Sequence, residues 1–219
     1  MQFLFDVRDS DSPFVERIWR TESTGGGSFI SAAETHWEMV VTKQMGGISF
    51  NVHGPETKAT TALIPEQGEF LGIIFKLGAF MPHLPTSNLV DGALSLPLAS
   101  ERSFWLHGSA WQFPDYENAD SFVERLVSGG LLVRDVQVES VLQGQSQDVS
   151  LRSVQRRFLK STGLTYTAIR QIERAQKSKS LLEQGFSILD AVDEAGYYDQ
   201  PHLTRSLKHF LGQTPAKIG

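Results

Sequence analysis

The chain has 219 residues, of which 40% are hydrophobic and 21% charged, and its formal net charge is −5. This length fits one large or two modest domains, and we expect two. The sequence contains no cysteine, which excludes disulfides, thiolate zinc sites and cysteine nucleophiles. Neither a signal peptide nor an apolar stretch of roughly eighteen residues is present, so we expect a soluble, cytoplasmic protein with no membrane partner.

Residues 1–118 are predicted to be rich in β-strands. Short runs of Val, Ile, Phe and Thr alternate with turn residues, and these runs are FLFDV, SFISA, WEMVVTK, ISFNV, TTALI and EFLGIIFKL. The pair Gly46-Gly47 suits a tight hairpin turn between two of them. Many short antiparallel strands indicate a barrel or a sandwich. We expect a cupin-like barrel of the jelly-roll type, which can enclose a ligand-sized interior.

Aromatic side chains in this region are candidates for lining an effector pocket, since such pockets are mostly apolar. The candidates are Trp37, Phe50, Phe75, Trp105 and Trp111, and the alternative for each is an ordinary core position.

Three residues of the same region are candidates for metal binding. His36 and Glu38 alternate on one predicted strand, and His53 lies on a later one. However, the spacing is His-x-Glu rather than His-x-His, and no clear fourth ligand is found. We predict no metal and no cofactor, and leave open whether these three residues bind anything.

From Ala119 the pattern becomes helical. A first helix, which joins the two halves, ends at Gly129-Gly130, and a short helix follows and ends near Gly144. The next helix is predicted to begin after Ser150 as its N-cap and to end at Gly163. Its apolar stripe consists of Leu151, Val154 and Phe158. We expect this stripe to face the core.

A longer helix is predicted between Thr165 and Gly185, followed by a second short helix, a turn at Gly196 and another helix. In that last helix Asp199 can act as the N-cap, and Pro201 lies in the first turn, where its missing N–H costs nothing. The region thus holds two helix-turn-helix units on one connecting helix. About 21 helical positions span roughly 30 Å, which is close to the roughly 34 Å of one turn of B-DNA.

The charges divide along the chain. Residues 1–136 hold 9 Lys/Arg and 17 Asp/Glu, whereas residues 137–219 hold 11 and 8, which gives a net charge of +3. Any contact with a polyanion is therefore expected in the last third.

Within the first unit, Arg152, Gln155 and Arg156 point away from the predicted apolar stripe, and Arg and Gln are the residue types that pair bidentately with guanine and adenine. The segments LRSVQRRF, STG and GYYDQPHLTRSLKHFLGQTP resemble the DNA-binding domain of the AraC/XylS family of transcription regulators, over about residues 136–218. This resemblance implies a double helix-turn-helix fold, a bacterial source and transcription regulation.

The family's base-reading positions carry over to Arg152 and Arg156 in the first unit, and in the second unit to Gln200, Pro201, His202 and Arg205. The side chains better suited to phosphate contacts are Ser150, Lys160, Lys208 and Thr214. The chain departs from the family pattern at Leu203 and Leu207, where Phe is usual, and at Val192, where Ala is usual. These departures are expected to leave the fold intact.

The front half, with HWEMVV and HGPETKATTALIPEQGEFLGIIFKLGAF, resembles the β-barrel sensing domain that precedes this DNA-binding domain in a subgroup of the family. The fold class expected is α+β, with a sensing domain at 1–118 and a connecting helix and DNA-binding domain at 119–219. The resemblance implies double-stranded DNA and a small-molecule effector as partners, and RNA polymerase if the protein is an activator.

Two recognition helices in one chain allow either a monomer or a homodimer. No ordered nucleophile or phosphate-loop motif appears, so no enzyme is predicted. The alternative is a cupin-like metal-binding or enzymatic barrel whose helical tail mediates assembly.

Overall fold

The computed structural model describes residues 5–145 and 150–218. It consists of a strand-rich N-terminal part followed by a helical C-terminal part, which is the α+β class expected. The largest sheet has six strands in the order β1-β2-β7-β4-β5-β9. These strands are β1 (Asp6–Arg8), β2 (Val15–Ser23), β4 (Glu38–Gln44), β5 (Gly47–His53), β7 (Gly68–Phe75) and β9 (Ala93–Ser95).

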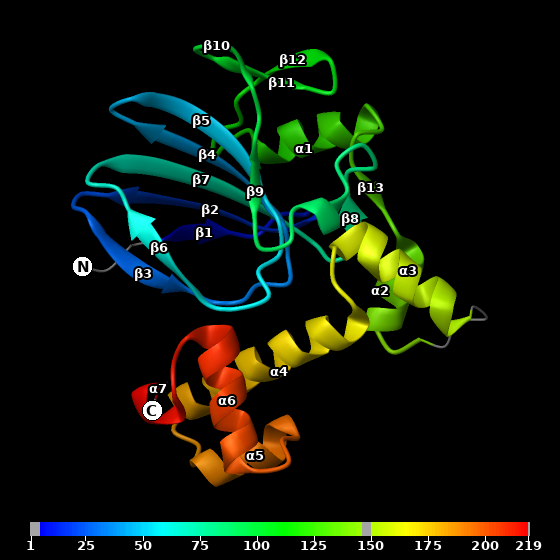
Figure 1. The fold of residues 1–219 in the computed structure, drawn as a ribbon. Coiled ribbons are helices and arrows are strands. Elements are labelled where there is room, and N and C mark those ends of the chain that lie inside the picture. The colour runs from blue at the N-terminus through cyan, green and yellow to red at the C-terminus, as the bar shows by residue number, and fades with distance from the viewer. Residues whose placement is uncertain (1–4, 146–149, 219) are drawn as a thin grey trace.

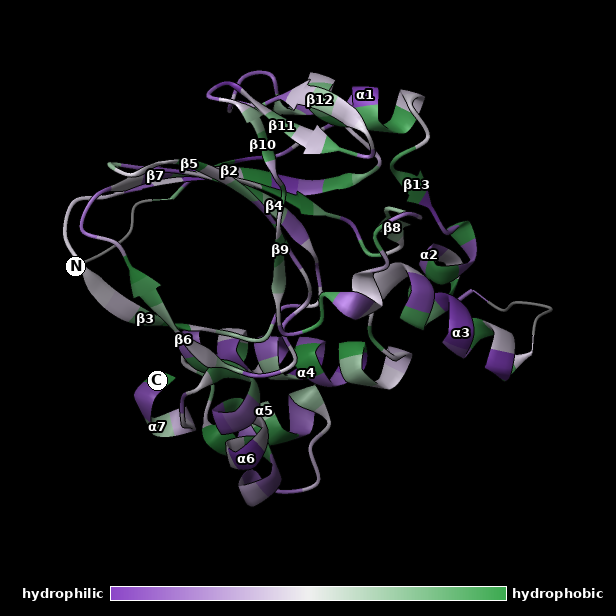
Figure 2. Ribbon diagram, turned by 45° about the horizontal axis from the view of Figure 1, so that its top comes forward, coloured by the Kyte–Doolittle hydropathy of each residue, from purple (hydrophilic) through white to green (hydrophobic). Residues whose placement is uncertain are grey.

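Among the described residues, three smaller sheets complete the strand-rich part. They are formed by β3 (Gly27–Ser31) with β6 (Thr60–Ile64), by β8 (Ala79–Phe80) with β13 (Val133–Arg134), and by β10 (Leu98–Ser100), β11 (Ser103–Leu106) and β12 (Ser109–Gln112). In Figure 2 the large sheet curls toward the β3–β6 pair, which lies opposite it.

The predicted hairpin turn is confirmed, since β4 and β5 pair in register up to Gln44 and Gly47. Gly47 has a φ of +126°, a conformation that disfavours residues with a side chain. Strand β2 was not expected, because charged residues alternate with its apolar ones. It nevertheless lies inside the sheet between β1 and β7, and its Ile18 is fully buried.

The helices follow the predicted order closely. They are α1 (Ala119–Ser128), α2 (Val136–Leu142), α3 (Leu151–Thr162), α4 (Tyr166–Glu183), α5 (Ile188–Ala195), α6 (Gln200–Leu211) and α7 (Pro215–Ile218), and a 3-10 turn, η1, covers Thr86–Asn88. None of the described helices has both the length and the apolar character needed to cross a membrane.

Three groups of buried side chains hold the molecule together. The first lies between the large sheet, β11 and α1 and includes Phe50, Phe75 and Phe122. The second joins α4, α5 and α6 around Leu203 and Leu207. The third joins α2, α3 and α4 and also includes Ala33 of the strand-rich part. Apolar burial therefore continues from the strands into the helices.

Candidate nucleic-acid interface

Helix α3 begins and ends where the sequence predicts. The Ser150 side chain accepts a hydrogen bond from the N–H of Ser153 at 3.3 Å, which satisfies one of the free donors of the first turn. Gly163 ends the helix with a φ of +76°, a left-handed conformation that favours glycine. The helix therefore has a fixed length of 12 residues.

Helix α6 is built in the same way. The Asp199 carboxylate accepts a hydrogen bond from the N–H of His202 at 2.7 Å, Pro201 occupies the first turn, and Gly212 ends the helix with a φ of +68°. This helix also has 12 residues. Counted from the N-cap, Arg156 and Arg205 both stand at the sixth helical position, so the two units place one arginine identically.

Both helices meet the strand-rich part at their C-terminal ends. A Cβ atom on Gly163 would lie 3.0 Å from the backbone of Thr86, and one on Gly212 would lie 2.7 Å from the side chain of Ile30. Figure 1 shows the same arrangement, with the N-terminal end of α6 directed away from the strands. The first turns, which meet base edges in helix-turn-helix proteins, are therefore the ends left uncovered.

Hydrogen bonds between the two parts fix α6 in this position. The N–H of Ala33 donates to the carbonyl of Phe210 at 2.6 Å, and the N–H of Ala59 donates to the carbonyl of His209 at 2.9 Å. Carbonyls in the last turn of a helix have no partner within the helix, so the strands supply two of the missing donors. Gln176 of α4 adds a hydrogen bond to the carbonyl of Ala33.

The arginines of the C-terminal part fall into two groups. Arg157 forms an ion pair with Asp135 at 3.1 Å, Arg170 pairs with Glu173, and Arg174 donates to the carbonyl of Gly196. Those predicted to read bases are Arg152, Arg156 and Arg205. All three are exposed, and no hydrogen bond or ion pair joins their guanidinium groups to the described part of the chain. The guanidinium groups of this second group are thus the ones that no polar contact within the described chain engages.

The other predicted reading residues lie on the same two helices. Gln155, Gln200 and Pro201 are exposed, whereas His202 is half-buried and its ring packs edge-to-face against Tyr197, with the centroids 5.1 Å apart. His202 is thus held in place by the turn that precedes α6.

The predicted phosphate contacts differ in their surroundings. Lys208 is exposed on α6, and Ser150 is exposed although its hydroxyl caps α3. The ammonium of Lys160 lies 5.5 Å from the centre of the Phe80 ring, and Thr214, before α7, is half-buried. Of the four, Lys208 is the least engaged within the chain.

The expectation for the apolar stripe of α3 is wrong at one position. Phe158 is fully buried, but Leu151 is 83% exposed. The reason is that Leu151 is the first residue of the helix, where the core formed with α2 and α4 no longer covers it.

The two units also differ in the length of the segment before the second helix. Five residues separate Gly144 from the N-cap Ser150, whereas two separate Gly196 from Asp199. The first unit therefore has more residues between these two positions.

The five aromatic residues predicted to line an effector pocket have different environments. Trp37 stacks on Phe75 with ring centres 4.0 Å apart and donates to the carbonyl of Ala79, while Phe50 is fully buried. Trp105 is 47% exposed. Trp111 is half-buried beneath the guanidinium of Arg125. Three of the five thus lie in the packed core, and an effector pocket formed by them stays a prediction.

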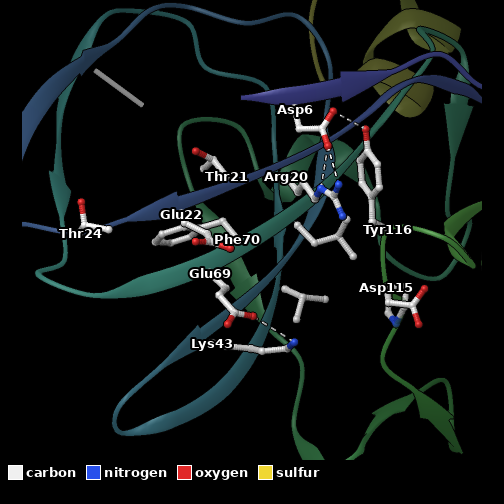
Figure 3. A pocket seen from close by; sticks show the side chains of 13 residues that line it. Asp6, Arg20, Thr21, Glu22, Thr24, Lys43, Glu69, Phe70, Asp115 and Tyr116 are labelled. Atoms are coloured by element: carbon white, nitrogen blue, oxygen red, sulfur yellow. Dashed lines mark hydrogen bonds and ion pairs between the residues drawn. The ribbon is translucent and has the colours of Figure 1, made fainter. Parts of the chain in front are cut away.

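A groove elsewhere on the strand-rich part has a volume of about 540 Å³ (Figure 3). Its apolar floor includes Val41 and Leu71, and ion pairs stand on its sides. Arg20 binds Asp6 at 2.7 Å and Lys43 binds Glu69 at 3.3 Å. The ring of Tyr116 lies 4.2 Å from the Arg20 guanidinium. No local sequence pattern predicts this groove, because its residues come from distant strands and from the segment before α1.

Two of the three candidate metal-binding residues, His36 and Glu38, are paired with other groups. His36 Nδ1 lies 2.7 Å from a carboxylate oxygen of Glu34, and Glu38 accepts a hydrogen bond from the Trp19 indole. Burial raises the pKa of Glu38 to about 7, and it lowers the pKa of His53. Within the described residues no three His, Asp or Glu side chains are grouped as a metal ion requires.

Comparison with known proteins identifies the helical part. Residues 145–218 match a family model described as a helix-turn-helix domain. The chain is 39% identical over 70 residues to the HTH-type transcriptional regulator RipA of Corynebacterium glutamicum, and 33% identical over 74 residues to RipA of Corynebacterium diphtheriae. These matches cover 32% and 34% of this chain but only 21% and 22% of those regulators, so the chain spans about a fifth of the relatives' length.

Among solved structures, ToxT from Vibrio cholerae aligns over 97% of both chains with 12% identity and a TM-score of 0.38. A second structure of ToxT, bound to (E)-4-(8-methylnaphthalen-1-yl)but-3-enoic acid, gives a TM-score of 0.39. These values are too low to support a conclusion about this chain.

Proposed function

We propose that residues 145–218, which match a family model described as a helix-turn-helix domain, form an AraC-type DNA-binding domain, and that the protein is a sequence-specific DNA-binding transcription regulator. The observation that carries the proposal is the arrangement of α3 and α6. Each has its C-terminal end against the strand-rich part and its first turn uncovered. The exposed side carries Arg152 and Arg156 on α3 and Arg205 on α6, and no polar contact within the described chain engages their guanidinium groups.

The geometry supports reading by one chain of two successive segments of the major groove. Helix α4 has 18 residues, so it is about 27 Å long at 1.5 Å per residue. This length is comparable to one turn of B-DNA, which is roughly 34 Å, and α4 connects α3 to the unit that contains α6. A single chain is then sufficient for a bipartite site, and a dimer is optional. RNA polymerase is a further partner if the protein activates transcription.

We assign base reading to the side chains on the uncovered faces of the two helices, which are Arg152, Gln155, Arg156, Gln200, Pro201, His202 and Arg205. Arg and Gln suit guanine and adenine respectively, and Pro201 offers only an apolar surface. Phosphate contacts are assigned to Ser150, Lys160, Lys208 and Thr214, whose hydroxyl and ammonium groups position the protein without selecting sequence.

Binding-site selection with the full chain tests this proposal. The wild-type protein should recover a motif with two elements about 10 base pairs apart. Arg156→Ala and Arg205→Ala should each lose about 1–3 kcal/mol of binding free energy, at one element only. Arg170→Ala is the matched control, because that arginine is already paired with Glu173 and should not change the motif. Failure of the wild type to prefer any sequence would contradict the proposal.

We also propose that the strand-rich residues 1–118 sense a small effector, while residues 119–219 carry the DNA-binding part. The groove of Figure 3 supports this, because an apolar floor between two ion pairs suits a small amphipathic molecule. Thermal-shift screening of metabolites tests it, since a ligand at 100 times its dissociation constant adds about 2.7 kcal/mol of stability. Arg20→Ala should weaken the shift given by a ligand of the groove.

Arg17→Ala is the control for that experiment. Arg17 lies on the same strand, β2, but three residues away, so its side chain points to the opposite face of the sheet. A ligand whose stabilising effect is the same in both variants does not bind in the groove.

A further inference from the structure

The side chain of Leu151 contributes little to the packing of α3. It is the first residue of the helix and its side chain is 83% exposed, whereas Phe158, two turns later, is fully buried. The hydroxyl of Ser150 caps the helix, so Leu151 is not needed to begin it. A single exposed leucine is ordinary on a protein surface. Leu151 is of interest because of its position in α3.

That position is equivalent to a proposed reading residue of the second unit. Both helices follow an N-cap directly and both have 12 residues, so Leu151 corresponds to Gln200 and Arg152 corresponds to Pro201. Both first residues are exposed, at the ends of their helices that the strands leave uncovered. In a helix-turn-helix unit this first turn is the part that meets base edges.

The chemistry of the side chain restricts what it can recognise. Leucine has no hydrogen-bonding group, so it cannot pair with the donors and acceptors of base edges. The 5-methyl group of thymine is the apolar feature that a base presents in the major groove. On the basis of the proposed DNA-binding function, we propose that Leu151 is a specificity-determining residue that contacts a thymine methyl group in the element bound by α3.

Replacement of thymine by deoxyuridine tests this contact, because it removes only the methyl group. The site is the one selected by the wild type, and its α3 element is the one whose preference Arg156→Ala relaxes. Each thymine there is replaced in turn and affinity is measured by fluorescence anisotropy. Wild type should lose about fourfold in affinity at one thymine, the loss expected when one buried methyl group is removed, whereas Leu151→Ala should bind both duplexes equally.

Leu189→Ala is the matched control. Leu189 is 66% exposed and lies in the first turn of α5, the helix of the second unit that does not enter the groove, so this variant should keep the wild-type response. The inference is overturned if Leu151→Ala keeps the response, or if no thymine in the α3 element responds in the wild type. A wild type that selects no sequence overturns the proposed function as well, so the two failures are distinguishable.

Discussion

The contact between the end of α3 and the strand-rich part can be tested with two glycines that share a backbone conformation but differ in their surroundings. Gly163 and Gly196 end α3 and α5 with φ values of +76° and +72°. Alanine in this conformation costs about 1–2 kcal/mol, and both variants should show that loss. Only Gly163 faces another segment, because a Cβ there would lie 3.0 Å from both the carbonyl carbon and the oxygen of Thr86.

Backbone atoms of η1 cannot rotate away as a side chain can, so Gly163→Ala should also separate the two parts. Overpacking of this kind costs about 1–3 kcal/mol. We therefore expect Gly163→Ala to lower the free energy of unfolding by at least about 1 kcal/mol more than Gly196→Ala. In thermal unfolding, each kcal/mol corresponds to a decrease of about 2–4 °C in Tm for a chain of this size.

Urea unfolding of the full chain provides the measurement with two independent signals. All four tryptophans lie within residues 1–118, so their fluorescence reports the strand-rich part, while far-ultraviolet circular dichroism follows the helices. If the two parts unfold together, Gly163→Ala should shift both transitions. Equal losses of stability in the two variants would refute the reasoning, because they would mean that the Thr86 contact contributes nothing.

Three further predictions concern single side chains. Glu38 has a folded-state pKa of about 7, above its ordinary value of 4.5. Between these two pH values the folded state binds more protons than the unfolded state, so the stability of the wild type should fall as the pH rises through this range. Glu38→Gln should abolish this dependence in urea titrations at several pH values. Asp135→Ala should cost about 1 kcal/mol of stability by chemical denaturation, since the carboxylate caps α2, with Asp135→Asn losing less. Lys208→Ala should weaken all DNA about equally and reduce the slope of log K against log salt by about one.

The helices could be predicted because their ends are marked locally. Ser150, Thr165 and Asp199 are side chains that cap a first turn, and Gly163 and Gly212 accommodate the left-handed conformation that ends a helix. Each signal acts within a few residues of the chain, so a single sequence contains it in full. The predicted boundaries of α3 and α4 and the predicted start of α6 accordingly agree with the structure.

Strand β2 and the exposure of Leu151 depend on contacts between distant residues. The indole of Trp19 lies over Gly72 of β7, where no side chain is possible, and donates to Glu38 of β4. No local pattern in the sequence of β2 contains that partnership. Likewise, Leu151 continues an apolar spacing, yet its burial would require a neighbour that the first turn of α3 does not have.

The packing of α6 against the strand-rich part could not be predicted from the sequence either, because it uses backbone groups. Ala33 and Ala59 donate through their N–H groups to the last turn of the helix, and an alanine in a loop carries no sequence signal for such a role. Both donors belong to the connections that flank β3 and β6, and Glu34 and Glu56 in those connections pair with each other as an isolated bridge. These two connections, which we call the platform and which include Ala33, Glu34, Glu56 and Ala59, therefore bind the last turn of α6 and join it to the strand-rich part.

This platform constrains how the proposed effector and DNA can influence each other. An effector can change DNA affinity only if it binds two conformations of the protein with different free energies. A change at the platform that breaks the hydrogen bonds to His209 and Phe210 would leave two carbonyls without donors, at a cost of about 1–3 kcal/mol for each one that stays buried. Because such coupling is reciprocal, DNA must alter effector affinity by the same factor by which the effector alters DNA affinity. Effector titrations with and without a selected duplex would therefore measure the same coupling free energy as DNA titrations with and without effector.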